Sequence, residues 1–333
     1  MPDTSIPSAP PPPRPWWVWL NVLGLDAVLT ALCWMPVFAR ATGARLDRVE
    51  YIVLGCAVWC IYAVDRFMDG RMAGGMRGER HHFAVRRWAL LLAVIILAAG
   101  ASGWMLLFEV REIVARWGVK FAVAVVFYFA VTWFSRRDWT GLAGAGGLGG
   151  LIAIGLMQGA GTGDLWMQLW RGVFAGFLVT VVYLSVRRAG APAPWTLPRK
   201  LLGGWLFAAG TALTPYAHLE RWPHLILDGQ VVLFGIICGL NSLGIRLWEK
   251  ERDDFESTLL ERLYPWMLLT AAAGAGMEWS AAHTSARPLF IACWTASLLL
   301  LLLHLTRGRT SVSVRRALAD AAMIVPALVV VWV

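Results

Sequence analysis

Residues 49–73 read VEYIVLGCAVWCIYAVDRFMDGRMA, and this stretch decides the fold because it joins an apolar run to two acids. Residues 49–67 are predominantly apolar and long enough to cross the hydrocarbon core of a bilayer as a helix. Asp65 and Asp69 stand at the end of this run, four residues apart. Carboxylates are costly beside a bilayer, so this pair needs an explanation.

Similar apolar runs recur along the whole chain. Of its 333 residues, 58% are hydrophobic and only 15% are charged, and the mean hydropathy is +0.60. This composition excludes an ordinary soluble domain and indicates a polytopic membrane protein. We expect an all-α transmembrane bundle of about 9–11 helices, with runs near 16–38, 49–67, 88–107, 117–134, 142–160, 166–188, 200–217, 226–248, 263–281, 288–306 and 317–333.

The basic residues collect in alternate loops. The N-terminal tail and the loops after even-numbered runs hold about three times as many Arg and Lys residues as the other loops. Because cytoplasmic loops carry this excess, we expect the N-terminus and the Asp65 end of the second run to be cytoplasmic. Orientation then accounts for the formal charge of +9 without a nucleic-acid partner. The expected location is a bacterial inner or plasma membrane.

Asp65 and Asp69 are predicted to lie one turn apart on one face of a helix. Mg²⁺ typically takes one or two protein carboxylates and fills its other positions with water and phosphate oxygens. The pair is therefore a candidate catalytic and magnesium site for a substrate that carries a diphosphate. The alternative is that both acids merely end a helix, in interfacial salt bridges with Arg66 and Arg71.

Other loops on the same predicted side carry residues that suit a metal-bound diphosphate. Glu249 and Asp253 repeat the four-residue spacing after the eighth run, so they are candidate ligands of a second metal. Asp26, near the middle of the first run, is a functional candidate because of its depth, whereas Asp320 is expected to pair within the bundle. Guanidinium groups can clamp phosphate, so several arginines are candidates to bind the substrate. The full set of candidate substrate-binding residues is Tyr62, Arg66, Arg71, Arg136, Arg137, Asn241 and Arg246.

The segment IYAVDRFMDG (61–70) resembles the first motif of the UbiA superfamily of intramembrane prenyltransferases, Asn-Asp-x-x-Asp-x-x-x-Asp. Asp65 and Asp69 match its last two acids, and Ile61 and Tyr62 stand at its first two positions. The segment SRRDWTGLAGAGGLGG (135–150) is similar to that family's entry to the fifth helix. The resemblance covers about residues 16–281, the UbiA-like bundle. A proline-rich tail (1–15), expected to be cytoplasmic, precedes this bundle, and additional C-terminal transmembrane helices (282–333) follow it.

Family membership would imply a helical bundle around a central cavity, where magnesium bridges Asp-rich motifs and the diphosphate of an isoprenoid donor. Ionisation of the allylic carbon–oxygen bond would leave a carbocation that an aromatic or lipid acceptor captures in an aromatic-lined chamber. The implied partners are a prenyl diphosphate, a lipophilic acceptor and the bilayer. The family's second Asp-rich motif ends the sixth helix, but the sixth run here ends VVYLSVRRAGAPAPW without an acid. Glu249 and Asp253 are the candidates to replace it.

Two other functions stay open. A transporter or a non-catalytic lipid-binding membrane protein would depend on mid-membrane groups such as Asp26. The segment DGRMA (69–73) is similar to the start of the CDP-alcohol phosphotransferase signature, although GMRGERHHFAVRR (75–87) lacks the aspartates that this signature needs later. Convergence of Asp65 and Asp69 with Glu249, Asp253, Arg136 and Arg137 would favour the diphosphate site.

Overall fold

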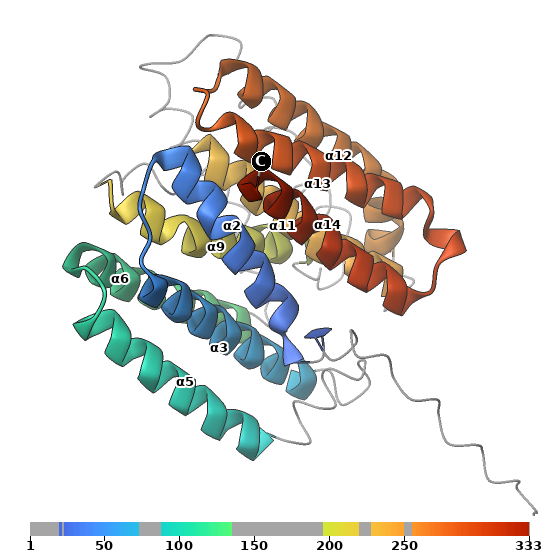
Figure 1. Ribbon diagram of the computed structural model, residues 1–333. Coiled ribbons are helices and arrows are strands. Elements are labelled where there is room, and N and C mark those ends of the chain that lie inside the picture. Colours follow the sequence, from blue (N-terminus) through green and yellow to red (C-terminus); the bar gives the residue numbers. More distant parts are fainter. Residues whose placement is uncertain are drawn as a thin grey trace, which may run out of the picture.

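A computed structural model describes residues 20–21, 23–72, 88–134, 196–219, 228–249 and 255–332. Within these ranges the regular structure is helical and no strand occurs (Figure 1). The elements are α2 (Leu25–Thr42), α3 (Arg48–Met72), α5 (Trp88–Phe108), α6 (Glu112–Phe134), α9 (Thr196–Ala217), α11 (Gly229–Glu249), α12 (Phe255–Ala281), α13 (Arg287–Leu305), the 3-10 turn η1 (Arg307–Arg309) and α14 (Val312–Trp332).

Each of these α-helices coincides with one of the predicted apolar runs, and the runs 142–160 and 166–188 lie outside the described residues. Four of the helices, α2, α5, α11 and α13, are long and apolar enough to cross a membrane. The all-helical prediction is confirmed for the part of the chain that the structure describes. The four apolar helices agree with a multi-pass membrane protein.

Contacts between helix termini divide the bundle into two ends. Arg66, near the end of α3, donates a hydrogen bond to the carbonyl of Asn21, just before α2. Glu249, at the end of α11, pairs with Arg316 near the start of α14. We call this end, where α2 and α14 begin and α3 and α11 end, the Arg66 end. The opposite end is called the Glu50 end.

At the Glu50 end, Glu50 links three parts of the chain. One of its carboxylate oxygens accepts a hydrogen bond from the Asp47 backbone N–H at 2.9 Å, which is the reciprocal half of a capping box at the start of α3. Its other oxygen lies 2.7 Å from Nε2 of His218, after α9, and Nδ1 of His218 lies 3.0 Å from Arg111. Because arginine only donates, Nδ1 accepts and Nε2–H donates to Glu50. The cluster therefore ties α3, α9 and the start of α6 together.

The core is built on close contact between α9 and α11. Gly204 of α9 lies against the backbone of Gly235 and Gly239 of α11, where a Cβ atom would overlap backbone atoms. Small residues at a crossing let two helices approach closely, as is common in membrane bundles. Trp34 of α2 donates a hydrogen bond to the carbonyl of Met323 at 2.8 Å. The C-terminal helix α14 thus shares one core with α2 and α11.

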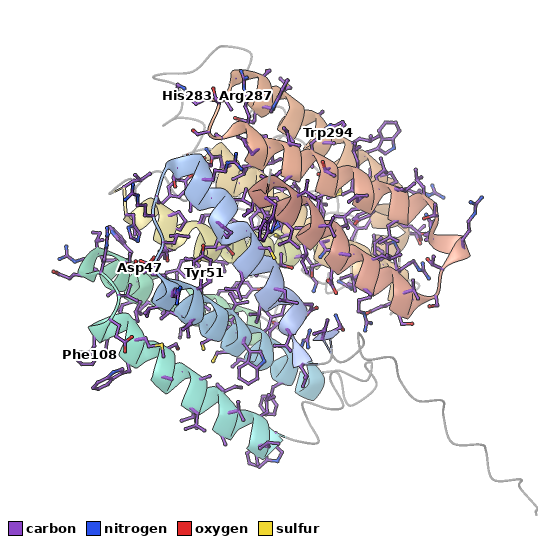
Figure 2. The ribbon with its side chains drawn as sticks, in the orientation of Figure 1. Asp47, Tyr51, Phe108, His283, Arg287 and Trp294 are labelled. Carbon is purple, nitrogen blue, oxygen red and sulfur yellow. The ribbon has the colours of Figure 1, made fainter. Side chains whose placement is uncertain are left out.

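The outer helices present apolar side chains away from this core. Figure 2 shows Phe108 at the outer edge of α5 and Trp294 on the outward side of α13, and these side chains are 66% and 47% exposed. Further exposed apolar residues of α5 are Leu90, Ile96, Leu97, Trp104 and Leu107. A helix that is apolar all round suits contact with lipid rather than with water.

Candidate functional site

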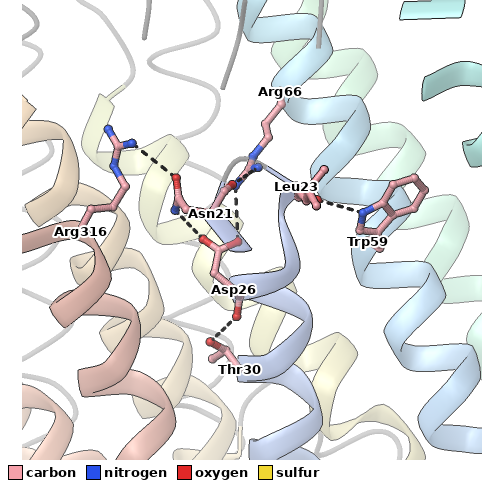
Figure 3. A network of polar contacts seen from close by, with 7 residues as sticks. All are labelled: Asn21, Leu23, Asp26, Thr30, Trp59, Arg66 and Arg316. Carbon is pink, nitrogen blue, oxygen red and sulfur yellow. Dashed lines mark hydrogen bonds and ion pairs between the residues drawn. The ribbon is translucent and has the colours of Figure 1, made fainter. Parts of the chain in front are cut away.

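A cluster of polar side chains occupies the Arg66 end of the bundle, and part of it is drawn in Figure 3. Its members come from the segment before α2 and from α2, α3, α11 and α14. We call this cluster the Arg66 network, and it consists of Asn21, Asp26, Arg66, Glu249, Arg316 and Asp320. Regions that are up to about three hundred residues apart in the sequence therefore meet at one point.

Asp26 is the acid at the centre of the network. The sequence predicted Asp26 near the middle of a helix. It lies instead in the first turn of α2, because α2 begins after Gly24. Its Oδ2 accepts a hydrogen bond from Nδ2 of Asn21 at 2.8 Å, and its Oδ1 lies 3.5 Å from Nη2 of Arg66. The two charged side chains are only 12% and 10% exposed. Removing one partner of such a buried pair costs about 3–5 kcal/mol.

Arg66 is held by protein groups on two sides. Besides its ion pair with Asp26, its Nη1 donates to the backbone carbonyl of Asn21. Gly24 leaves room for this contact, since a Cβ atom there would lie 3.3 Å from the same Nη1. Arg66 therefore fixes the segment before α2 against α3.

Arg316 connects the α14 side of the network to the α2 side. Its Nη2 pairs with Glu249, and its Nη1 lies 3.4 Å from Oδ1 of Asn21. Asp320, one turn later on α14, lies beside Asn21 and within electrostatic range of Asp26. Glu249, a predicted metal ligand, is thus the partner of an arginine in this structure.

An aromatic column leads from the network into the core. Tyr62, one turn before Arg66 on α3, packs edge-on against Phe207 of α9 with ring centroids 6.2 Å apart. Phe207 lies 6.1 Å from Phe234 of α11, and Phe234 stacks on Trp34 of α2 at 4.0 Å. We call these four rings the aromatic column. It provides a continuous apolar path beside a charged helix end.

Asn241 lies on α11 between the column and the network. It follows Phe234 by seven residues and precedes Glu249 by eight, so the three share one face of the helix. Its side-chain oxygen is buried and has no hydrogen-bond partner among the residues that the structure describes. Buried polar atoms usually have a partner.

The structure describes the backbone of the first predicted acid pair, Asp65 and Asp69, and the side chain of Asp65. Helix α3 continues unbroken to Met72, so Asp65 and Asp69 lie one turn apart on one helix. Asp65 is partly buried and lies within electrostatic range of Tyr62. The side chains of Asp69 and Arg71 lie outside the described part of the structure, as do the residues Arg136, Arg137 and Asp253. Arg246 lies in the last turn of α11.

The magnesium site predicted at Asp65 and Asp69 stays a prediction. No group of three or more His, Cys, Asp or Glu side chains is close enough to hold a metal within the described ranges. Mg²⁺ needs only one or two protein carboxylates, because water and phosphate oxygens complete its octahedron. The spacing of Asp65 and Asp69 on a continuous helix meets this requirement.

Sequence reasoning missed Asn21 and Arg316 as members of this site. Arg316 was visible only as one basic residue among many in the predicted cytoplasmic loops, and Asn21 carried no signal. Their roles depend on contacts across 295 positions of sequence.

No protein-family model, curated protein or solved structure matches the chain.

Proposed function

We propose that this chain is an integral membrane prenyltransferase of the UbiA type. It would bind the diphosphate of a prenyl donor at the Arg66 end, accommodate the isoprenoid chain along the aromatic column, and transfer that chain to an aromatic or lipid acceptor. One observation carries the proposal: the Asp65–Arg66 turn of α3 directly adjoins a column of four rings, of which Tyr62 and Phe207 are partly buried and the other two fully buried. A prenyl diphosphate has a charged diphosphate and an apolar isoprenoid chain. The charged end of α3 suits the diphosphate, and the apolar interior beside it suits the isoprenoid chain.

The charges at this end favour a diphosphate that arrives with a cation. Asp26 and Glu249 already pair with Arg66 and Arg316, and Asp65 and Asp320 add two further carboxyl groups. A free diphosphate would therefore meet a site that is not positively charged. Mg²⁺ held by Asp65 and Asp69 would neutralise the diphosphate as it leaves.

In the proposed reaction, the allylic carbon–oxygen bond of the donor breaks and diphosphate leaves with the electron pair. The resulting carbocation forms a bond to a nucleophilic atom of the acceptor, which then loses a proton. The faces of Tyr62 and Phe207 can stabilise the cation, since aromatic rings attract positive charge over their faces. Buried rings also keep water away from the carbocation.

Two rival functions receive less support from the geometry. A carrier would depend on Asp26 as an ionisable group in mid-membrane, but Asp26 forms a largely buried ion pair with Arg66. The CDP-alcohol phosphotransferase signature needs aspartates after its DGRMA-like start (69–73), and residues 75–87 contain none.

The proposal is tested with purified full-length protein, labelled geranyl, farnesyl and geranylgeranyl diphosphates, and a membrane lipid extract as acceptor. We expect magnesium-dependent transfer or diphosphate release, and a fall of about a hundredfold or more in Asp65→Asn, because a metal ligand is lost. Chelation of Mg²⁺ by EDTA should abolish wild-type turnover.

The matched control is Glu112→Gln, which removes an 86% exposed carboxylate at the start of α6 and should leave turnover unchanged. Equal turnover in wild type and Asp65→Asn would contradict the metal-binding role of Asp65. Absence of turnover with every donor would contradict the prenyltransferase proposal itself.

A further inference from the structure

A chain of polar contacts at the Glu50 end of the bundle plays no part in the proposed function. It joins Glu50 of α3, His218 after α9 and Arg111 before α6, and Figure 1 shows these three helix ends at the same end of the bundle. We infer that this chain is a pH-sensitive latch, which holds the start of α6 on α9 and opens when His218 takes up a second proton. The inference does not rest on the proposed function.

His218 is the central member of the latch, and both of its ring nitrogens have a protein partner. Its Nε2 lies 2.7 Å from Oε1 of Glu50, and its Nδ1 lies 3.0 Å from Nη1 of Arg111. The side chains of Glu50 and His218 are only 1% and 4% exposed. A guanidinium group can only donate, so the ring is neutral, with its proton on Nε2 and the lone pair of Nδ1 facing Arg111.

Acidification acts on the latch through His218. Among the described residues, the charged groups in contact with His218 are Glu50 from α3 and Arg111 from the turn before α6. Tyr51, the next residue on α3, lies within electrostatic range of Glu50, and tyrosine is neutral at and below neutral pH. Histidine is the side chain whose charge ordinarily changes between about pH 5 and 8.

A second proton on His218 breaks its contact with Arg111 and keeps its contact with Glu50. An imidazolium carries N–H on both nitrogens, so Nδ1 can no longer accept from Arg111. Two cations would then face each other across 3.0 Å and repel. The Nε2–H still donates to Glu50, now as a charge-assisted hydrogen bond. Arg111 is exposed, so acid releases it into solvent and leaves His218 in place.

Release of Arg111 should loosen the first turn of α6 without detaching the helix. The carbonyl of Arg111 accepts a hydrogen bond from the Ala115 N–H at 3.0 Å, so the tie to His218 steadies this turn. Val114 is buried in the core, and Phe121 lies against Gly210 of α9 farther along the helix. These apolar contacts do not depend on pH. The expected change is therefore a local opening at the start of α6.

The test measures amide hydrogen exchange of residues 109–116 in the full-length protein in detergent, at about pH 7.5 and about pH 5.5. After correction for the intrinsic pH dependence of exchange, we expect the protection of the Ala115 amide to fall about fivefold to tenfold at the lower pH, because one hydrogen bond is lost. In His218→Gln, protection should be equal at both pH values. The amide of glutamine can accept from Arg111 and donate to Glu50, but it does not titrate.

The matched control is His283→Gln, which removes an exposed histidine in the turn between α12 and α13 and should keep the wild-type pH response. Arg111→Ala removes an exposed side chain and leaves no latch to release, so its protection should be low at both pH values. Equal protection of wild type at the two pH values would overturn the inference. A pH response that persists in His218→Gln or in Arg111→Ala would also overturn it. Thermal unfolding at both pH values confirms that each protein compared is folded.

Discussion

Gly24 places the polar residues that surround Asp26. Its φ of 76° lies in the left-handed region, which costs side chains that carry a Cβ atom about 1–2 kcal/mol. This conformation interrupts the helical path, and the Asn21 carbonyl accepts hydrogen bonds from Gly24 N–H and from Arg66. A single backbone conformation therefore links α2, α3 and the Arg66 network.

We predict that Gly24→Ala lowers both stability and diphosphate affinity. The control is Gly43→Ala, because Gly43 also has a φ of 76° but no atom lies within 4 Å of the position of a Cβ. Both variants should lose about 1 kcal/mol of stability through backbone strain. Only Gly24→Ala should weaken diphosphate binding, since its methyl group presses on Arg66. Wild-type diphosphate binding by Gly24→Ala would contradict this account of Gly24.

Helices α9 and α11 pack closely against each other, and glycine at their crossing is the reason. Gly204 faces Gly235 and Gly239, which stand four residues apart on one face of α11. The glycine and alanine content of the spans predicted close helix contact in general, but not this pair. The crossing also holds Phe207 and Phe234 in register, so it supports the aromatic column.

Substitution of Gly204 tests the crossing. Gly204→Ala inserts a methyl group where backbone atoms of α11 already lie, so overpacking should cost about 1–3 kcal/mol. The control is Gly276→Ala in α12, where nothing lies within 4 Å of the new Cβ. Alanine favours helix over glycine by up to about 1 kcal/mol, so the control should be neutral or slightly stabilising. Thermal unfolding in detergent measures both, and equal midpoints would contradict the proposed crossing.

The described part of the chain begins and finishes at opposite ends of the bundle. Asn21, before α2, lies at the Arg66 end with Arg316, whereas Arg40 at the end of α2 binds the Val330 carbonyl near the end of α14. Helices α2 and α14 therefore run in the same direction. The chain enters the described structure at one end of the bundle and leaves it at the other. An odd number of membrane spans has this consequence.

We predict that the two termini lie on opposite sides of the membrane, with the N-terminus in the cytoplasm. Reporter fusions that are active only inside or only outside the cell should give opposite signals at the two termini. A reporter inserted at the η1 turn, between α13 and α14, should give the same signal as the N-terminus. Identical signals at both termini would contradict the odd number of spans.

The sequence alone determined the helices. Hydropathy and run length are local properties, and an α-helix satisfies its backbone within a few residues, so nine predicted runs became helices close to the expected residues. It also placed Asp65 and Asp69 one turn apart, because that spacing follows from the helical repeat. The magnesium role of this pair and the UbiA resemblance stay predictions.

Only the tertiary structure decided which helix ends meet. Spacing along one helix gives no information on its neighbours, so neither the pairing of Glu249 with Arg316 nor the place of Asn21 could be read from the chain. The position of Asp26 was misjudged for a related reason. Hydropathy does not register a left-handed glycine, and Gly24 moved this acid from mid-helix into the first turn of α2, where packing gave it Arg66 as a partner.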